Sequence, residues 1–362
     1  MLTTIIAFSA LTNTLLGQPT GSRTWNYMRE DFYSQDSSAE REKTLLALIK
    51  ALNERYVIPE VAKKIEGELT KWMKTPEFAQ LDDPEAFAQR VNEILAANVT
   101  DAHLRFRYSA QVLPERKQAE EPSPEEIERF NRYVRRQNAN FRAVERLEGN
   151  IGYLAFDGFT EPEDLARPMA AAMEFLQNTD AMIIDLRSNG GGSPSGVQVV
   201  CSYFFPPEPV LLNRIYFRRG DKSETFESWT LKDLPAPRFL DKPLYILVGK
   251  RTGSGAEECA YNFQQLHRGT IIGEPTWGGA NPGGTVRIDD HHLCFIPVGR
   301  AENPYTKTNW EGTGVIPDIR VNAEKAKTTA QILILKELAG KETDPDYKSD
   351  LESLIQRLES GN

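Results

Sequence analysis

The stretch Lys250-Arg-Thr-Gly-Ser-Gly-Ala-Glu-Glu258 is the one around which the chain is organised. It follows the apolar run Pro243-Leu-Tyr-Ile-Leu-Val-Gly249 and leads into a helical pattern over residues 259–266. A short strand, a glycine-containing corner and a helix predict that Ser254 lies at a strand-to-helix turn, with an exposed hydroxyl and unpaired amides after it. Ser254 is therefore a candidate nucleophile, although a serine with Glu257 three residues later is also the capping box of an ordinary helix.

The composition predicts a globular protein. A chain of 362 residues with 40% hydrophobic residues can bury a sizeable core, and its length suggests two domains, or one large domain with an appendage. The formal net charge is −9, and the sequence contains no large block of lysine and arginine. Because a nucleic-acid backbone is bound by clustered positive charge, this composition argues against a nucleic-acid partner.

Cysteine and histidine occur without the spacing of a disulfide framework or a zinc site. The cysteines are Cys201, Cys259 and Cys294, and the histidines are His103, His267, His291 and His292. We expect buried thiols, with Cys259 in the core, and neither a bound metal nor a cofactor.

Residues 1–17 are apolar and uncharged, and a polar segment follows them. Their length is that of the apolar part of a signal peptide, which predicts a secreted or periplasmic protein. The expected basic residues at the start are missing, so an apolar terminal segment that is not cleaved is the alternative. No other run approaches spanning length, and we expect no integral membrane span in the mature protein.

The next part of the chain has helical periodicity. Apolar residues recur at helical spacing over residues 39–56, 61–73 and 84–97, and Asp82 and Asp83 are available to cap the third helix. We expect a three-helix bundle as an N-terminal domain over residues 38–100.

Residues 101–149 are predicted to form an entry strand and a charged connector. The pattern changes from helical to alternating over residues 98–108, and His103 lies at that junction. Residues 115–137 are rich in proline and in both charges, which indicates a solvated connector and helix.

From residue 150 the pattern is that of an α/β domain. Residues 151–156 predict a strand, residues 163–178 an amphipathic helix, and residues 181–187 a fully apolar strand. The turn Ser188-Asn-Gly-Gly-Gly-Ser193 follows, at the end of a strand, where open α/β sheets place their ligand sites.

The glycines of this turn have three interpretations. A phosphate cradle is a poor one, because no G-x-G-x-x-G or G-K-[ST] frame is present. Simple turn punctuation is the second. In the third, a glycine lets a backbone amide face a developing oxyanion without a side chain in between.

The rest of the sequence predicts further strands, loops and terminal helices. We expect a β-hairpin region over residues 215–231, a buried strand at 269–273, a Gly/Pro loop at 274–284, a hairpin from 285–289 and 292–298, an irregular segment at 299–319 and C-terminal helices within residues 322–362.

Four segments in this order resemble the signature segments of the C-terminal-processing, or tail-specific, serine peptidases. They are Asp185-Leu-Arg-Ser-Asn-Gly-Gly-Gly192, Thr252-Gly-Ser-Gly-Ala-Glu257, Ile272-Gly-Glu-Pro-Thr276 and Trp310-Glu-Gly-Thr-Gly-Val-Ile-Pro-Asp318. The segment Asp101-Ala-His-Leu-Arg-Phe106 is similar to the branch that contains the tricorn protease core and the interphotoreceptor retinoid-binding protein repeats. The resemblance implies a crotonase-like (ClpP/crotonase) α/β core over residues 150–321.

The resemblance also implies which residue is the base. Bacterial tail-specific peptidases pair the serine with a lysine in an F-G-K-G-like loop, but here the loop reads Trp277-Gly-Gly-Ala280, with Gly279 in place of the lysine. The tricorn-like branch resembles a Ser-His-Glu arrangement, and the matching residues are Ser254, His103 and Glu311.

Further roles follow from the same resemblance. It implies that the backbone amides of Gly192 and Gly255 form the oxyanion hole, which agrees with their expected positions. Asp185 and Arg187 are expected to support the glycine turn through an ion pair or backbone contacts. Relatives place a serine before the histidine where this chain has Ala102, so a fourth relay member is in doubt.

Each candidate also has an ordinary structural interpretation. His103 is alternatively a satisfied polar residue beneath the helices, and Glu311 alternatively caps a turn. His291 and His292 lie on the predicted hairpin turn, and we expect both to be solvated.

The sequence thus predicts a serine-type peptidase acting on a peptide or protein substrate, with an oligomeric state that it leaves open. Residues 108–150 contain no carboxylate-binding loop or β module of a PDZ domain. The alternatives are an esterase or amidase, and a non-enzymatic binder of hydrophobic ligands of the retinoid or fatty-acid kind. For the binder, the residues considered as pocket lining are Phe156, Phe159, Phe204, Phe205 and Trp277.

Overall fold

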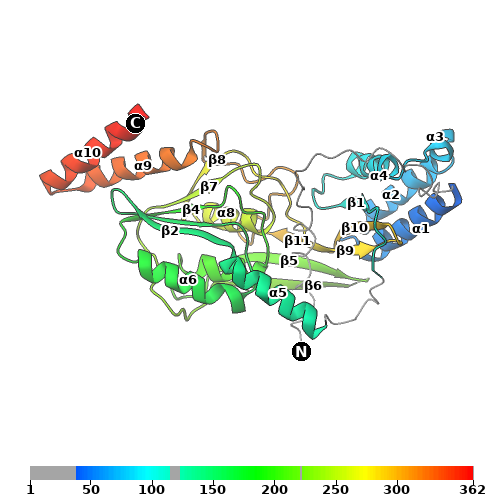
Figure 1. The fold of residues 1–362 in the computed structure, drawn as a ribbon, viewed down its shortest axis with the longest axis horizontal. Coiled ribbons are helices and arrows are strands. Elements are labelled where there is room, and N and C mark those ends of the chain that lie inside the picture. The colour runs from blue at the N-terminus through cyan, green and yellow to red at the C-terminus, as the bar shows by residue number, and fades with distance from the viewer. Residues whose placement is uncertain (1–37, 115–122, 221, 362) are drawn as a thin grey trace, which may run out of the picture. The chain divides into compact units, whose positions relative to one another are not determined.

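The computed structural model describes residues 38–114, 123–220 and 222–361, so the predicted signal peptide at 1–17 lies outside the described residues. The chain forms two compact units, and each has a hydrophobic core of its own. The first unit includes residues 216–224 and 281–300, far along the chain from its helices. Figure 1 shows the order of the elements in both units.

Within its described residues, the first unit has four helices. They are α1 (Ser38–Arg55), α2 (Pro59–Trp72), α3 (Pro76–Gln80) and α4 (Pro84–Asn98). The side chain of Asp83 caps α4 by accepting a hydrogen bond from the Ala86 amide at 2.6 Å, as its position in the sequence predicted. The short α3 was not predicted, and it begins where the Thr75 side chain accepts from the Phe78 amide.

A three-stranded antiparallel sheet completes this unit. The strands β1 (Arg105–Tyr108), β9 (Gly283–Arg287) and β10 (His292–Pro297) have the order β1-β10-β9. The hairpin of β9 and β10 confirms the prediction. Strand β10 pairs with β1 over a long sequence separation, which explains why residues 281–300 pack with the N-terminal helices.

The prediction that His292 is solvated is wrong. His292 begins β10, and its alternation with Leu293 turns the imidazole inward, where it is 3% exposed. The ring stacks on Phe106 with 5.1 Å between centroids, and Nδ1 lies 2.9 Å from a carboxylate oxygen of Asp289. His291 is half-buried, and its Nδ1 lies 2.9 Å from the Ser109 carbonyl oxygen.

The second unit is a mixed α/β fold around a six-stranded sheet of order β12-β8-β7-β4-β3-β2. Its strands are β2 (Phe141–Leu147), β3 (Ile151–Phe156), β4 (Ala181–Asp185), β7 (Leu244–Val248), β8 (Thr270–Gly273) and β12 (Ile319–Arg320). All neighbouring pairs are parallel except β2 and β3. Every residue of β3 and β4 is buried, as expected for strands covered on both faces.

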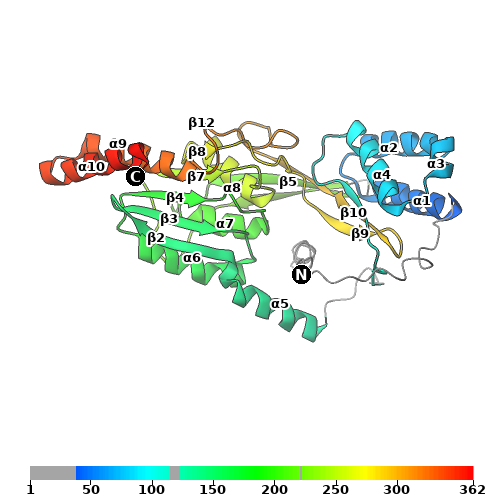
Figure 2. The ribbon, with the colours of Figure 1, turned by 45° about the horizontal axis from the view of Figure 1, so that its top comes forward.

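Helices cover both faces of this sheet, as Figures 1 and 2 show. On one face, Leu154, Ile184 and Ile246 share a core with α6 (Pro162–Leu176), α7 (Pro194–Ser202) and α8 (Gly255–Gln265). On the other face, Tyr153, Ile183 and Leu247 pack with α9 (Ala326–Lys341) and α10 (Pro345–Ser360). The split follows from the alternation of side chains along a strand.

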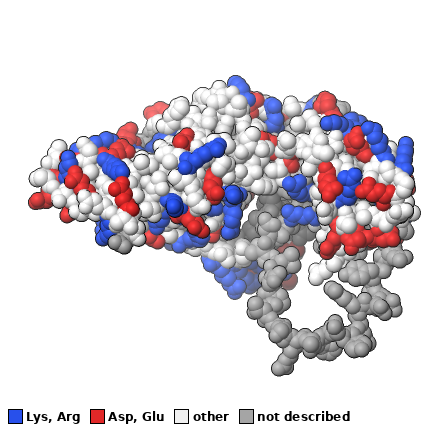
Figure 3. All heavy atoms as spheres, turned by 90° about the horizontal axis from the view of Figure 1, so that it is seen from above, with Lys and Arg blue, Asp and Glu red and all other residues white. Residues whose placement is uncertain are grey.

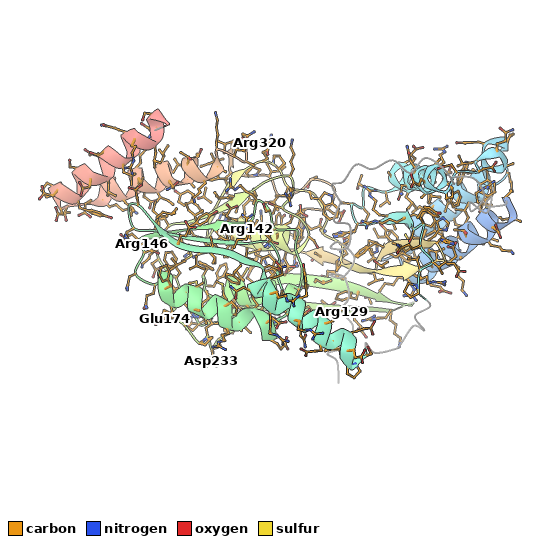
Figure 4. All side chains as sticks on the ribbon, in the orientation of Figure 1. Arg129, Arg142, Arg146, Glu174, Asp233 and Arg320 are labelled. Carbon is orange, nitrogen blue, oxygen red and sulfur yellow. The ribbon has the colours of Figure 1, made fainter. Side chains whose placement is uncertain are left out.

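The remaining elements lie outside these layers. They are α5 (Pro124–Arg136), the 3-10 turn η2 (Asn138–Asn140), and β5 (Leu211–Arg219), β6 (Lys222–Trp229) and β11 (Gly299–Glu302), which form a sheet of order β11-β5-β6. Edge strand β2 carries Arg142 and Arg146 (Figure 4), and charged side chains on an edge discourage pairing with another chain.

Four of the five residues considered as lining for an apolar ligand lie in the hydrophobic core. Phe156, Phe159, Phe204 and Phe205 are at most 6% exposed and belong to the core shared with α6, α7 and α8. Trp277 is different, because 46% of it is exposed. The four phenylalanines therefore contribute to the packing of the second unit.

The loops that carry the signature segments follow adjacent parallel strands. The segments after β4, β7 and β8 contain the glycine turn, Ser254 and the Trp277 loop respectively. Since the carboxyl ends of neighbouring parallel strands meet at one edge of a sheet, these three segments lie together at that edge.

The surface carries both signs of charge. On the face in Figure 3, basic and acidic side chains are interspersed over most of the described residues. Within residues 38–114, 123–220 and 222–361, none of the helices combines the length and the apolar character that a membrane crossing needs.

Glu258 provides a test of the core beneath α8. It is 5% exposed, and burial raises its pKa to about 7, although the nearby Asn213 side chain acts to lower it. The unfolded chain releases this proton near the ordinary value of 4.5, so the free energy of unfolding should fall as the pH rises from 4.5 to about 7. The difference between the two pKa values corresponds to a loss of about 3 kcal/mol in the free energy of unfolding.

The wild type should lose this stability as the pH rises, whereas Glu258→Gln has no group to titrate at this position. We therefore expect the unfolding free energy of Glu258→Gln minus that of the wild type to increase by about 3 kcal/mol from about pH 4 to about pH 8. Urea denaturation at a series of pH values measures this, and Glu352→Gln on the exposed side of α10 is the control. A constant difference between Glu258→Gln and the wild type over this range would contradict the expectation.

Candidate active site

Ser254 occupies a strained turn between β7 and α8. Its backbone has φ 52° and ψ −121°, a conformation that residues with a side chain rarely adopt. The serines that cap α5 and α7, Ser123 and Ser193, instead have the extended backbone of ordinary caps. Strain of this kind at a sharp strand-to-helix turn is typical of an exposed nucleophile.

Neighbouring segments hold this turn in place. The Thr252 hydroxyl donates to the Leu186 carbonyl oxygen at 2.7 Å and accepts from the Gly249 amide at 3.0 Å. The Gly253 amide donates to the Asn189 carbonyl oxygen at 3.1 Å. The turn after β7 is therefore fastened to the glycine turn after β4.

Glu257 is more than the second half of a capping box. It accepts the Ser254 amide at 2.8 Å, as a cap would, but the side chain is fully buried. The same carboxylate accepts the Thr276 hydroxyl at 2.5 Å and the amides of Gly278 and Gly279 at 2.5 and 2.9 Å. Burial raises the pKa of Glu257, and these four donors oppose the rise.

Because a carboxylate has about four acceptor positions, these donors saturate it. Glu257 thus joins the Ser254 turn to residues 276–279, in the loop after β8. Sequence reasoning noted Glu257 only as a cap, because the spacing of three residues is the same for a surface capping box and for a buried anchor.

The glycine turn packs tightly against the Ser254 turn. A Cβ on Gly191 would lie 2.8 Å from the Gly255 amide nitrogen, and a Cβ on Gly192, where φ is 133°, would lie 2.1 Å from the Phe159 carbonyl oxygen. Neither position admits a side chain. A Cβ on Gly255 would lie 3.3 Å from the Gly192 amide nitrogen, so the two glycines are neighbours.

These glycines leave amides available. Gly255 is the first residue of α8, where the amides have no acceptor within the helix. Within the described part of the chain, neither the Gly192 nor the Gly255 amide donates a hydrogen bond to another group of the protein. Two such donors near a serine suit a developing negative charge on oxygen.

Buried Asp185, at the end of β4, pairs with the partly exposed Arg187. Asp185 accepts the Arg187 Nε at 2.9 Å and Nη2 at 2.5 Å, and also the Tyr153 hydroxyl at 2.7 Å. Burial alone would raise the pKa of Asp185, but the hydrogen bonds from Arg187 and Tyr153 outweigh it and hold the pKa below its ordinary value. Arg187 also donates to the Ala323 carbonyl oxygen at 2.7 Å, which fixes the start of the glycine turn.

Glu311 lies against the Trp277 loop. Its carboxylate accepts the Ala280 amide at 2.7 Å, and its own amide donates to the Asn309 side chain at 3.0 Å. Backbone contacts of the same segment reinforce this position, since the Gly312 amide donates to the Gly278 carbonyl oxygen at 2.9 Å. The loop that Glu257 ties to Ser254 therefore also holds the carboxylate of Glu311.

His103 belongs to the first unit. Its backbone amide donates to Asp101 at 3.1 Å, and its ring stacks on Phe295 with 5.3 Å between centroids. Asp101 is buried and also accepts the Tyr56 hydroxyl at 3.1 Å and the Asn281 side chain at 2.9 Å. Burial lowers the pKa of His103 to about 4, so the imidazole is neutral near pH 7.

The predicted site residues are thus distributed over both units. Ser254, Gly192, Gly255 and Glu311 are connected within the second unit, together with the pair Asp185 and Arg187. His103 lies in the first unit, so its pairing with Ser254 stays a prediction. Asp101, which fixes the backbone before His103, was not assigned a role from the sequence, although it is the first residue of the segment that contains the histidine.

A lysine base has little support in the second unit. Gly279, at the place of the lysine in the F-G-K-G-like loop, uses its amide to bind Glu257. Lys250, the lysine nearest in sequence to Ser254, lies 3.7 Å from Glu274 and has a side chain that is 81% exposed.

Comparisons with known proteins agree on one family. Residues 150–321 match the model of peptidase family S41. Carboxyl-terminal-processing peptidase 2, chloroplastic, of Arabidopsis thaliana is 30% identical over 173 residues, which are 46% of this chain and 31% of that protein. The tricorn protease of Thermoplasma volcanium is 26% identical over 159 residues, which are 42% of this chain and 13% of that protein.

A solved structure supports the fold. A lipoprotein from Streptococcus agalactiae has a TM-score of 0.51 at 16% identity, over 84% of this chain and 99% of that one. The chain spans about a third of the length of the first curated relatives that it matches.

Removing the Glu257 carboxylate should destabilise the second unit. Glu257→Ala leaves four buried donors without their acceptor, and we expect the free energy of unfolding to fall by about 3 kcal/mol in urea denaturation. The control is Glu163→Ala, an exposed glutamate in the first turn of α6, which should change stability by less than about 0.5 kcal/mol. Equal effects of the two variants would show that Glu257 is an ordinary cap.

Proposed function

Because residues 150–321 match the model of peptidase family S41, we propose that the chain is a serine-type peptidase that hydrolyses peptide bonds with Ser254 as the nucleophile. The observation that carries this proposal is the strained backbone of Ser254 beside two glycine amides that have no acceptor within the described chain. A peptide or protein is the proposed substrate.

The proposed reaction is acyl transfer through a Ser-His-Glu arrangement. The Ser254 hydroxyl attacks the carbonyl carbon of the substrate while His103 takes its proton, and the amides of Gly192 and Gly255 donate to the oxyanion. His103 then protonates the leaving amine. Water hydrolyses the acyl-enzyme by the same route, and Glu311 orients and stabilises the imidazolium.

His103 has the protonation state that the proposed base needs. A base must be neutral to accept the serine proton, and the lowered pKa of His103 keeps it neutral near pH 7. Asp185 and Arg187 have a supporting role, because their ion pair fixes the residues that lead to Gly192.

Several finer features belong to the same proposal. The second unit is proposed to have the crotonase-like core of processing peptidases, over residues 150–321, with a connector at 101–149 and the tail at 322–362. The helices of residues 38–100 are proposed to act as a bundle that presents the His103 segment, with no PDZ domain between them and the core. Residues 1–17 are proposed to direct secretion.

A fluorophosphonate probe tests the nucleophile. We expect the wild type to be labelled and Ser254→Ala to lose labelling, because the probe forms a covalent bond with an activated serine hydroxyl. The control is Ser123→Ala, which removes the serine of the ordinary capping box of α5 and should leave labelling unchanged. Undiminished labelling of Ser254→Ala, read by gel fluorescence and peptide mapping, would remove the assignment.

The pH dependence of labelling tests the base. With a pKa of about 4, His103 is protonated only in acid, so the labelling rate should stay level down to about pH 5 and fall through about pH 4. His103→Gln should lower the rate by about 100- to 10,000-fold, whereas His291→Gln should not. An acid limb centred near pH 6.5, or a near-normal rate in His103→Gln, would point to another base.

A further inference from the structure

We propose that the indole of Trp277 forms an apolar wall beside Ser254 and selects substrates with an aromatic or aliphatic side chain next to the bond that is cleaved. This inference rests on the proposed peptidase function and adds the class of substrate side chain to it.

The position of the indole follows from its contacts with the nucleophile turn. The Trp277 amide donates to the Thr252 carbonyl oxygen at 3.0 Å. A Cβ on Gly253 would lie 3.2 Å from Cε3 of the indole, so the ring packs directly over the residue that precedes Ser254. A side chain at Gly253 would push the ring away, which explains the glycine at that position.

The loop around Trp277 is held on both sides. Thr276 and Gly278, its two neighbours in the chain, both donate to the buried carboxylate of Glu257, and that carboxylate also accepts the Ser254 amide. The same anchor therefore positions the nucleophile and the indole. An aromatic side chain on such a backbone is a preorganised contact, because little conformational entropy is lost when a ligand packs on it.

The exposure of Trp277 is unusual for its surroundings. Trp310, whose Nε1 donates to the Gly279 carbonyl oxygen of the same loop, is 2% exposed, whereas Trp277 is 46% exposed. A single exposed apolar residue needs no functional explanation by itself. Here, however, the exposed ring adjoins the residue that would carry the acyl group, so an acylated substrate has to lie within its reach.

The chemistry of the indole defines the side chains that it favours. A broad apolar face with no charge gains by covering aromatic or branched aliphatic groups. An aromatic pair typically changes affinity or rate by about 2- to 10-fold. The selection should therefore be a bias among cut sites and not an absolute requirement.

A cleavage profile tests this inference. The wild type, Ser254→Ala, Trp277→Ala, Trp277→Phe and Trp229→Ala are incubated with a mixture of peptides from a proteome digest, and new termini are identified by mass spectrometry. Trp229 is the matched control, because it is 41% exposed in the same unit and its Nε1 binds Glu227 on β6. Thermal unfolding of each variant is measured in parallel.

We expect the wild type to enrich aromatic and aliphatic residues by about 5-fold at one position flanking the cut. Trp277→Ala should reduce this enrichment to less than about 2-fold, Trp277→Phe should retain most of it because it keeps an aromatic face, and Trp229→Ala should leave it unchanged. The same enrichment in Trp277→Ala as in the wild type would overturn the inference and leave the peptidase proposal intact. Cleavage that is absent in the wild type, or that persists in Ser254→Ala, would overturn both.

Discussion

The four hydrogen bonds to the buried carboxylate of Glu257 are the interaction on which the geometry of the site depends. A buried carboxylate without donors would be far too costly to keep ionised. Here its acceptors are saturated by one amide from the Ser254 turn and by three donors from residues 276–279. Neither segment can move without leaving part of this charge or its donors unpaired. The interaction therefore positions Ser254 and the loop beside it at the same time.

This anchor also explains how the strain at Ser254 is maintained. A side chain in such a backbone conformation costs on the order of 1–3 kcal/mol, and it persists only where the surroundings leave no alternative. The surroundings here are the Thr252 bonds to Leu186 after β4 and to Gly249 after β7, the contact of Gly191 with Gly255, and Glu257. The strain then keeps Ser254 at the tip of the turn, with the amide of Gly255 behind it.

The sequence predicted elements whose signals are local. Apolar runs identified β3, β4, β7 and β8, and their glycine-rich ends indicated one edge of a parallel sheet. Spacing could not separate the buried anchor Glu257 from a capping residue, because both lie three residues after a serine. Nor could it show that His292 points inward, since that depends on the pairing of β10 with β1, about 190 residues away in the chain. For the same reason, the sequence did not show that residues 216–224 and 281–300 belong to the first unit. The partner of a strand can lie far away in the chain, so the residues around the strand do not identify it.

The loop after β8 binds Glu257 through its backbone. Each group of residues 277–279 that faces Glu257 is a backbone amide, and no side chain extends from Gly278 or Gly279. If residue 279 were a lysine, its side chain would have to extend from a backbone whose amide is already bonded to Glu257. The glycine thus fits a loop that binds a carboxylate and supports an indole. In the first unit, burial lowers the pKa of His103 to about 4, so the proposed base is neutral near pH 7.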